Sequence, residues 1–379
     1  MSASTLSTIH VYPVKSVAGV SMSTAWVEKQ GLMFDRRFML AKADGAMVTA
    51  RKYPHMVQVK SVLCPDGLLF TAPNRPSLRI RYSTFKMQST PVTVWGDTFS
   101  AYTTSDEADD WFSEVVGCRV ELVFTGEQSH RIREKLGHNV SFADGYPLLI
   151  ISEGSLADLN ERSREMHTMD QFRANLIASN LEPFVEDSWK RIRIGEVEFE
   201  IVKPCERCIL TTVDTEKGVF KASKEPLKTL SEFRANESGG VFFGQNLVAK
   251  NEGMIRAGDA IEVLEYKEKE YYVDRTSQRD KETFSAAQVE QSVEQTVTIK
   301  VNNREFVGDN QRTMLEQAEA AGINIPNSCR AGLCGACRVK VVAGNVTHAQ
   351  VPALDHIDVE GGEALACCAV PSSDIEVNY

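Results

Sequence analysis

The sequence lacks several features that define whole classes of protein. No run approaches about 18 consecutive apolar residues, so we expect no membrane-spanning helix. The first residues contain no basic segment followed by an apolar one, so we expect no secretory signal. The net charge of −10 lacks the basic surplus that binding to a nucleic-acid polymer requires. A content of 42% hydrophobic and 25% charged residues instead indicates a soluble globular protein, which we expect in the cytoplasm.

The nine cysteines fall in an uneven pattern along the 379 residues. Cys64 and Cys118 stand alone, and Cys205 and Cys208 form a C-x2-C pair. The other five lie near the C-terminal end: Cys329, Cys334, Cys337, Cys367 and Cys368. Clustered cysteines in a cytosolic chain are more often metal ligands or catalytic groups than disulfide partners, because that compartment keeps thiols reduced.

The order of patterns along the chain predicts a mainly β protein with an α+β unit at its C-terminal end. Short alternating runs over residues 8–125 indicate an antiparallel β domain. Thr104 and Glu107 predict a capping box for a helix that ends at Gly117. We predict a first domain over 1–122, a second over 123–266, a charged linker over 267–293 and a third domain over 294–379.

The third domain reads as a compact α+β module. Asn302-Asn303 between two strand-like runs predicts a β-hairpin. Thr313 and Glu316 predict a capping box for a helix that ends at Gly322. A cysteine-rich loop and further strand-like runs follow.

The cysteine loop of this module has the spacing of an iron–sulfur site. Cys329, Cys334 and Cys337 form C-x4-C-x2-C, and Cys367 follows after 29 further residues, which is the plant-type [2Fe–2S] spacing. A zinc site is the alternative, but zinc modules usually pair two short knuckles. Cys368 is the alternative fourth ligand, and the register of the ALAC segment favours Cys367. Residues 294–379 resemble a plant-type ferredoxin, which implies a β-grasp fold and a one-electron carrier.

The C-x2-C pair alone leaves half a zinc site, a redox pair and two buried thiols open. Its context is more specific, because four further segments accompany it. These are VYPVKS at 11–16, DRRFML at 35–40, ADGYP at 143–147 and FRAN at 172–175, with CERCILTTVDTEKG from residue 205. Together they resemble the MOSC (molybdenum cofactor sulfurase C-terminal) family of YcbX type, related to the mitochondrial amidoxime-reducing components. The resemblance implies an N-terminal MOSC β-barrel, a MOSC β-barrel domain and the linked ferredoxin.

The resemblance also implies which residues hold a molybdenum cofactor. Cys208 is the implied thiolate ligand of molybdenum and the catalytic residue. Lys and Arg suit the cofactor's phosphate, whereas Ser, Asn and loop residues suit its pterin. The implied cofactor-binding residues are Lys15, Ser16, Arg37, Asp144, Gly145, Tyr146, Arg173, Asn175, Cys205, Glu206 and Arg207. Asp144 and Asp214 are also candidates for proton transfer, or else for surface turns.

The implied activity is reduction of small N-hydroxylated compounds, such as 6-hydroxylaminopurine, hydroxylamines and amidoximes. Neither a G-x-G-x-x-G fingerprint nor a P-loop occurs, so we expect no NAD(P)H or flavin site in this chain. An NADPH-dependent flavoprotein reductase is therefore the expected electron donor. Two other functions stay open: a sulfur carrier with a persulfide on Cys208, and a non-catalytic iron–sulfur electron-transfer protein.

Overall fold

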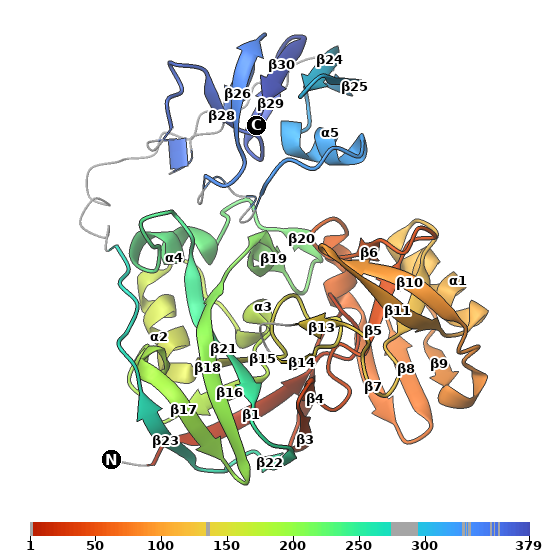
Figure 1. Ribbon diagram of the computed structural model, residues 1–379, viewed down its shortest axis with the longest axis vertical. Coiled ribbons are helices and arrows are strands. Elements are labelled where there is room, and N and C mark those ends of the chain that lie inside the picture. The colour runs from red at the N-terminus through yellow and green to blue at the C-terminus, as the bar shows by residue number, and fades with distance from the viewer. Residues whose placement is uncertain are drawn as a thin grey trace. The chain divides into compact units, whose positions relative to one another are not determined.

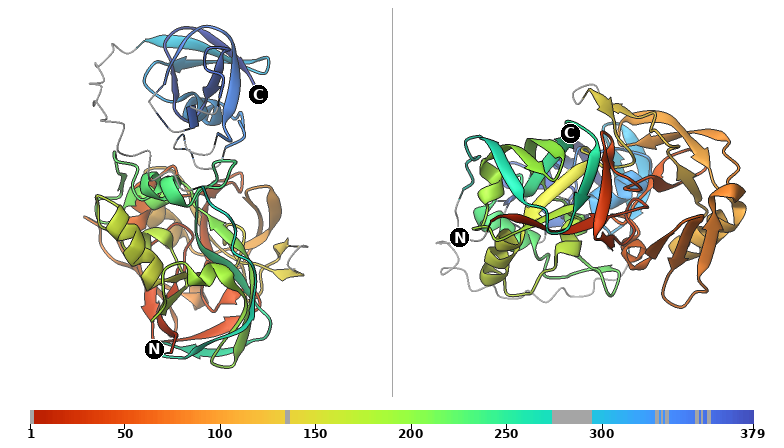
Figure 2. Two further views of the ribbon diagram at one scale, coloured as in Figure 1. Left: turned by 90° about the vertical axis from the view of Figure 1, so that its left-hand side faces the viewer. Right: turned by 90° about the horizontal axis from the view of Figure 1, so that it is seen from below.

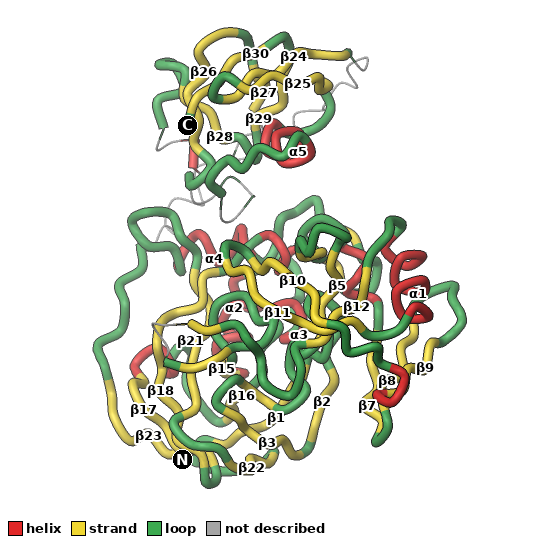
Figure 3. The backbone as a smooth tube through the Cα atoms, turned by 45° about the vertical axis from the view of Figure 1, so that its right-hand side comes forward, coloured by secondary structure: helices red, strands yellow, loops and turns green. Residues whose placement is uncertain are grey.

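The structure is a computed structural model that describes most of the chain. The described residues are 3–133, 137–273, 295–327, 330, 332, 335–348, 351, 353–354 and 357–379. They form two compact units, each described by itself below. The first unit comprises Met1–Cys205, Leu210–Ala222 and Phe243–Glu270, and the second comprises Glu206–Ile209, Ser223–Phe242 and Tyr271–Tyr379. Strands predominate over helices throughout (Figure 3), which confirms the predicted mainly β class.

The largest sheet of the first unit has eight strands (Figure 1). In spatial order these are β2 (Val20–Met22), β1 (Thr5–Val11), β16 (Leu176–Ser179), β15 (Leu148–Ser152), β21 (Phe242–Ala249), β18 (Val197–Glu206), β17 (Trp189–Ile194) and β23 (Ile261–Tyr266). A smaller sheet of β22 (Gly253–Arg256), β3 (Thr24–Glu28) and β4 (Gly31–Leu32) belongs to the same unit. Strand β1, red in both views of Figure 2, pairs with β16 from much later in the chain.

Backbone hydrogen bonds curl the large sheet toward closure. The amide of Leu6 donates to the carbonyl of Asp259 at 2.8 Å, and the amide of Ile261 donates to Ser4 at 2.9 Å. The start of β1 therefore joins the segment that leads into β23. Closure of this kind satisfies backbone groups that would otherwise be an exposed edge.

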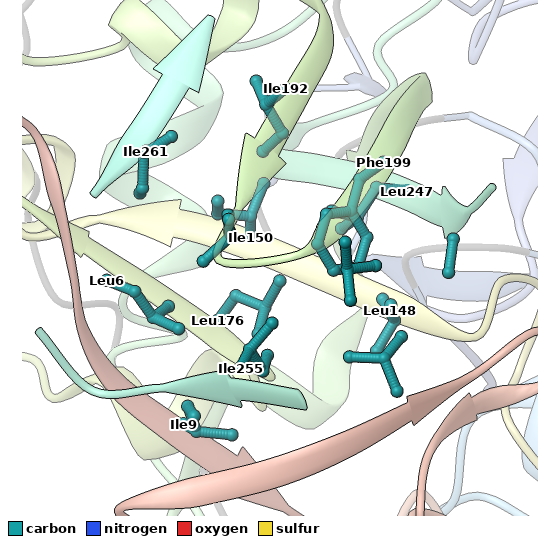
Figure 4. Close-up of a cluster of buried hydrophobic side chains, with 14 of the residues drawn as sticks. Leu6, Ile9, Leu148, Ile150, Leu176, Ile192, Phe199, Leu247, Ile255 and Ile261 are labelled. Carbon is teal, nitrogen blue, oxygen red and sulfur yellow. The ribbon is translucent and has the colours of Figure 1, made fainter. Parts of the chain in front are cut away.

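Alternating apolar side chains fill the inside of this curled sheet (Figure 4). The buried residues of β1 include Leu6 and Ile9, which pack with Ile150, Leu176 and Phe199 from other strands. Each is at most 1% exposed, so each contributes about 1.5–3 kcal/mol by leaving water. This core fixes the end of β1, and therefore the turn that follows it.

A second group of strands forms the part predicted as the N-terminal barrel. One sheet has the order β10 (Ser89–Val94), β11 (Asp97–Thr103), β12 (Glu121–Phe124), β5 (Phe38–Ala41) and β6 (Met47–Val48). The amide of Thr93 donates to Gly45 at 2.9 Å, which ties the first strand of this order to the last. A meander of β7 (Lys60–Cys64), β8 (Gly67–Thr71) and β9 (Leu78–Arg81) packs on the same core.

Helix α1 (Asp106–Val116) closes that core and corrects one prediction. The N-cap is Ser105, whose hydroxyl accepts a hydrogen bond from the amide of Ala108, and not Thr104. Thr104 instead donates its hydroxyl to the carbonyl of Leu122 at 2.7 Å, so a tertiary contact displaces it from the cap. Gly117 ends the helix at φ 81°, as predicted.

The remaining elements are short. The helices are α2 (Glu153–Arg162), α3 (Met169–Phe172), α4 (Leu227–Phe233), η1 (Pro54–Gln58), η2 (Tyr82–Thr84), η4 (Val185–Ser188) and η5 (Ile209–Thr212). The paired short strands are β13 (Ile132–Arg133) with β14 (His138–Asn139), and β19 (Val213–Asp214) with β20 (Val219–Phe220). Among the described residues, none of these helices is long and apolar enough to cross a membrane.

The C-terminal part of the second unit has the predicted mixed α+β build. Its sheet has the order β25 (Arg304–Asp309), β24 (Thr296–Val301), β30 (Ile375–Asn378), β26 (Arg338–Ala343) and β28 (Glu363–Leu365). Helix α5 (Met314–Ala320) packs on the same core, and β27 (Val346–His348) pairs with β29 (Ala369–Pro371). The predicted hairpin at Asn302-Asn303 and the Thr313–Glu316 capping box are both confirmed.

The predicted domain boundaries at 122 and 266 stay predictions. Strands β1 and β2 precede residue 122, yet they belong to the large sheet of β15–β18. Most of the linker predicted over 267–293, from residue 274 onward, lies outside the described residues.

Candidate functional site

A tight turn after β1 presents Lys15 and Ser16. The turn is closed by a hydrogen bond from the amide of Val17 to the carbonyl of Val14 at 3.2 Å. Ser16 has φ 70°, the left-handed conformation that a type II turn needs at its third residue. The amide of Lys15 donates to the carbonyl of Phe38 on β5 at 2.8 Å. Both predicted residues are buried, so the fold holds this turn rigidly.

The ammonium of Lys15 is bound to the loop before β15. It donates to the carbonyl of Phe142 at 2.8 Å and to Oδ1 of Asp144 at 2.5 Å. Burial lowers the pKa of Lys15 to about 8, although Asp144 acts in the opposite direction. Loss of water contact acts to raise the pKa of Asp144, but the charges of Lys15 and Arg51 hold it well below its ordinary value. At pH 7 this is an ion pair.

The loop that carries Asp144, Gly145 and Tyr146 is fixed from behind by Arg131. That buried guanidinium donates through Nη2 to the carbonyl of Asp144 at 3.1 Å and through Nε to Asp97 at 2.8 Å. The ring of Tyr146 lies 5.6 Å from Nζ of Lys203. A Cβ added at Gly145 would meet open space, so this position tolerates a ligand close to its backbone.

Arg173 ends α3 in the left-handed conformation, with φ 57°. Its Nη1 donates to the carbonyl of Val17 at 2.7 Å, which ties it to the Lys15–Ser16 turn. Its guanidinium lies 4.3 Å from the ring centre of Tyr12, and that of Arg36 lies 4.4 Å from the same ring. Burial lowers the pKa of Arg173 to about 10, and the charge of Arg36 lowers it further. Two cations share one aromatic ring, which is an arrangement suited to an anion.

Asn175 lies behind this arginine pair. Its amide nitrogen donates to Oδ1 of Asp35 at 3.1 Å and to the carbonyl of His10 at 3.0 Å. Its Oδ1 accepts from Nη1 of Arg36 at 2.9 Å. Arg36 also donates to Asp35 at 2.6 Å. Asn175 therefore orients Arg36, and the residues of its network are buried or nearly so.

Arg37 lies apart from these groups. Its Nη2 donates to Glu28 at 2.5 Å, and its Nη1 donates to the carbonyls of Gly126 at 3.3 Å and Glu127 at 2.5 Å. The two arginines of the DRRF segment thus serve different networks, and Arg36 is the one that reaches Arg173. Arg36 lies in a turn with φ 47°, whereas Arg37 comes directly before β5, so the turn separates the two side chains.

The C-x2-C pair lies at the end of β18. Cys205 belongs to that strand, and Cys208 lies between it and η5. Both thiols are half-buried, and Glu206 is exposed. The amide of Arg207 donates to the carbonyl of Val241 at 2.7 Å, which holds the loop. Thr211, three residues after Cys208, accepts from Nε2 of Gln171 on α3 at 3.1 Å.

A cavity of about 790 Å³ lies within the first unit. Its lining includes Tyr12, Gln58, Ser61, Gln171, Arg173 and Leu210. The volume is typical of a site for a cofactor or small molecule. Nη2 of Arg173 and Oγ of Ser61 are both buried without a hydrogen-bond partner among the described residues. Buried polar atoms without partners are costly, so these two fit a site whose ligand supplies the missing acceptors.

Two of the four predicted cluster ligands lie in described parts of the second unit. Cys337 and Cys367 are both buried, and the sulfur of Cys367 contacts the thiol of Cys337 and the backbone N–H of Gly332. Cys368 is less buried, with its sulfur 3.5 Å from that of Cys367. Cys329 and Cys334 lie outside the described residues. Cys367 is the more buried of the two alternative fourth ligands, and its assignment stays a prediction.

Family models match three consecutive parts of the chain. They are a MOSC N-terminal beta barrel domain over residues 3–119, a MOSC domain over 137–262 and a 2Fe-2S iron-sulfur cluster binding domain over 297–372. Human mitochondrial amidoxime reducing component 2 is 32% identical over 279 residues, which cover 68% of this chain and 82% of the relative. The chain belongs to the amidoxime-reducing component family.

Human mitochondrial amidoxime-reducing component 1 is 31% identical over 280 residues, covering 69% of this chain and 83% of the relative. Among solved structures, an Amycolatopsis cytochrome P450 reductase is 34% identical at a TM-score of 0.21, covering 22% of this chain and 26% of that one. The three family matches show that this member of the amidoxime-reducing component family combines the two MOSC parts with an iron–sulfur domain in one chain. That combination makes it an oxidoreductase with an electron-transfer domain, and the two predicted cofactors are those associated with these domains.

Proposed function

We propose that this protein reduces N-hydroxylated compounds at a molybdenum cofactor and takes its electrons through its own [2Fe–2S] cluster. The observation that carries the proposal is the joint presence, in one chain, of family membership over 279 residues and an iron–sulfur domain. A two-electron reduction needs a supply of single electrons, and a fused cluster provides one. The reaction balances as R–NHOH plus two electrons and two protons, giving R–NH2 and water.

The residues around the cavity suit the cofactor. Arg173 and Ser61 line the cavity, and the buried Nη2 of Arg173 and Oγ of Ser61, which have no hydrogen-bond partner among the described residues, suit phosphate or pterin oxygens as acceptors. Lys15 and Ser16 belong to the neighbouring turn, whose Val17 carbonyl accepts from Arg173, and their ammonium and hydroxyl groups are the proposed contacts from that turn. Gly145, Tyr146, Cys205, Glu206 and Arg207 are the proposed loop contacts. Arg37, which is bound to Glu28, is the predicted cofactor contact that these groups leave to one side. When bound, the cofactor supplies a two-electron redox centre, with the Cys208 thiolate as its protein ligand.

The chain's own residues position charge and protons. Lys15 is protonated at pH 7 and is held by Asp144. It therefore offers a fixed positive charge in the turn after β1. Asp214 accepts hydrogen bonds at Oδ1 from the amides of Glu216 and Lys217, both at 3.0 Å. That carboxylate therefore builds a turn, and Asp144 is the better candidate of the two for a role at the site.

The electron donor is a separate NADPH-dependent flavoprotein reductase, and we place the protein in the cytoplasm. The 2Fe-2S domain supports electron exchange with such a reductase. Small N-hydroxylated bases, hydroxylamines and amidoximes are the proposed substrates, by analogy with the names of the human relatives.

The test is conversion of 6-hydroxylaminopurine to adenine by the purified, cofactor-loaded protein. We expect turnover with NADPH and a flavoprotein reductase, and none with NADPH alone. Cys208→Ala should abolish turnover and bound molybdenum, while Cys64→Ala should leave both, because Cys64 ends β7 and is none of the predicted ligands. Equal loss of turnover and molybdenum in both variants would contradict the assignment of Cys208 as the molybdenum ligand. A persulfide on Cys208 in molybdenum-free protein would instead support a sulfur carrier.

A further inference from the structure

Trp95 occupies an unusual place at the tip of the β10–β11 hairpin. Val94 pairs with Asp97, so Trp95 and Gly96 are the two loop residues. Trp95 has φ 56°, a left-handed conformation that two-residue loops usually give to Asn, Asp or Gly. A bulky aromatic residue is strained there, and strained residues gather at functional sites. Half of its side chain is nonetheless exposed (50%).

The surroundings fix the indole beside the Lys15–Asp144 pair. Its Nε1 donates to Oδ1 of Asp144 at 3.3 Å, the same oxygen that accepts from Lys15. The guanidinium carbon of Arg51 lies 4.6 Å from the centre of the ring, and Arg51 also donates to Oδ2 of Asp144 at 3.1 Å. The ring is thus held by a hydrogen bond at one edge and by a cation over one face. The rest of the ring faces solvent.

We propose that Trp95 is a substrate-binding residue that stacks planar, π-rich N-hydroxylated substrates. This rests on the proposed function, because Lys15 and Asp144 belong to the proposed cofactor site. An indole held edge-on by a carboxylate and backed by a guanidinium is a rigid stacking surface, and stacking on aromatic side chains accepts any planar ring. Aromatic amidoximes and hydroxylaminopurines benefit from it, whereas hydroxylamine itself has no ring to stack. Trp95 therefore sets the preference between these substrates.

The kinetic test compares benzamidoxime with hydroxylamine in the wild-type protein and three variants. Trp95→Asn removes the ring but suits the left-handed backbone, so the hairpin keeps its fold. We expect this variant to raise KM for benzamidoxime about tenfold and to leave KM for hydroxylamine unchanged. Trp95→Phe should restore most of the preference. Trp26→Phe is the matched control, since Trp26 is also exposed (41%) but lies on β3.

An equal change of both KM values in Trp95→Asn would overturn the proposal, because it would mean that Trp95 only supports the ion pair. A fall in molybdenum per chain in Trp95→Asn would also overturn it, because the ring would then serve the cofactor and not the substrate. If the wild-type protein reduces neither compound, the proposed function is wrong, and the proposal for Trp95, which rests on it, is wrong as well.

A binding titration gives a readout that does not depend on turnover. Benzamidoxime added to the loaded protein without an electron donor should quench part of the tryptophan fluorescence. That part should vanish in Trp95→Phe and persist in Trp26→Phe. Quenching that persists in Trp95→Phe would show that benzamidoxime does not stack on Trp95.

Discussion

The ammonium of Lys15 lies 2.5 Å from Oδ1 of Asp144, a residue 129 positions later in the chain. Lys15 comes from the turn after β1, and Asp144 from the loop before β15. Their contact joins a segment of the N-terminal MOSC match to a segment of the MOSC match. The burial of Lys15 within this pair is the structural reason for the first prediction.

The stability of the molybdenum-free protein should depend on pH through Lys15. Its pKa is lowered by burial from 10.5 to about 8, so between these values the unfolded chain binds more protons than the folded one. Stability therefore rises with pH across that window. The free energy of unfolding of the wild type relative to Lys15→Met should rise by on the order of 2–3 kcal/mol between pH 8 and 10.5. Denaturant titrations at a series of pH values measure it.

A difference between the two proteins that stays flat across this window would show that folding does not lower the pKa of Lys15. Asp144→Asn serves as the control. Removing the carboxylate takes away the group that raises the pKa of Lys15, so the rise should begin at a lower pH than in the wild type.

Arg173→Ala and Arg37→Ala should separate cofactor binding from folding. Arg173 donates to the carbonyl of Val17 and has a buried Nη2 without a partner among the described residues, so its loss should cost less stability than that of Arg37 but most of the bound molybdenum. Arg37→Ala leaves Glu28 and two carbonyls without their donor, so we expect a loss of about 1–3 kcal/mol in unfolding free energy. Molybdenum per chain and the melting temperature measure the two effects. The opposite pattern would move the cofactor contact to Arg37.

The iron–sulfur loop offers a matched pair of glycine variants. Gly332 and Gly335 have similar left-handed conformations, with φ 71° and 69°. A Cβ at Gly332 would lie 2.6 Å from Cβ of Val351 and 2.8 Å from Sγ of Cys368, whereas at Gly335 it would meet open space. Both alanine variants carry the conformational cost, but only Gly332→Ala adds a clash.

We therefore expect Gly332→Ala to lose most of its iron and visible absorption, and Gly335→Ala to keep most of both. Iron analysis and absorption spectra of freshly purified proteins measure this. Equal losses of iron would mean that the left-handed backbone conformation alone, and not the contact with Val351 and Cys368, decides whether the loop binds the cluster.

Local patterns predicted those parts of the fold in which neighbouring residues decide the outcome. The Asn302-Asn303 hairpin and the Thr313–Glu316 capping box are such cases, since their signals lie within a few residues. The cap of α1 was wrong by one residue because Thr104 bonds to Leu122, a partner that no local pattern reveals. The pairing of β1 with β16 is equally remote in the sequence.

The candidate site divides in the same way. Family motifs pointed to Lys15, Asp144 and Arg173, and the structure links all three through the turn after β1. Sequence reasoning missed Arg36 and Trp95, because their roles depend on tertiary contacts with Tyr12 and Asp144. The tip of a two-residue hairpin loop was the available signal for Trp95.

The central claim is that one chain holds both a molybdenum centre and the cluster that feeds it. The most direct measurement is elemental analysis of iron and molybdenum in freshly purified protein from a cofactor-replete host. The account predicts about two irons and one molybdenum per chain, with molybdenum lost in Cys208→Ala and iron retained. Iron without molybdenum in the wild-type protein would contradict it.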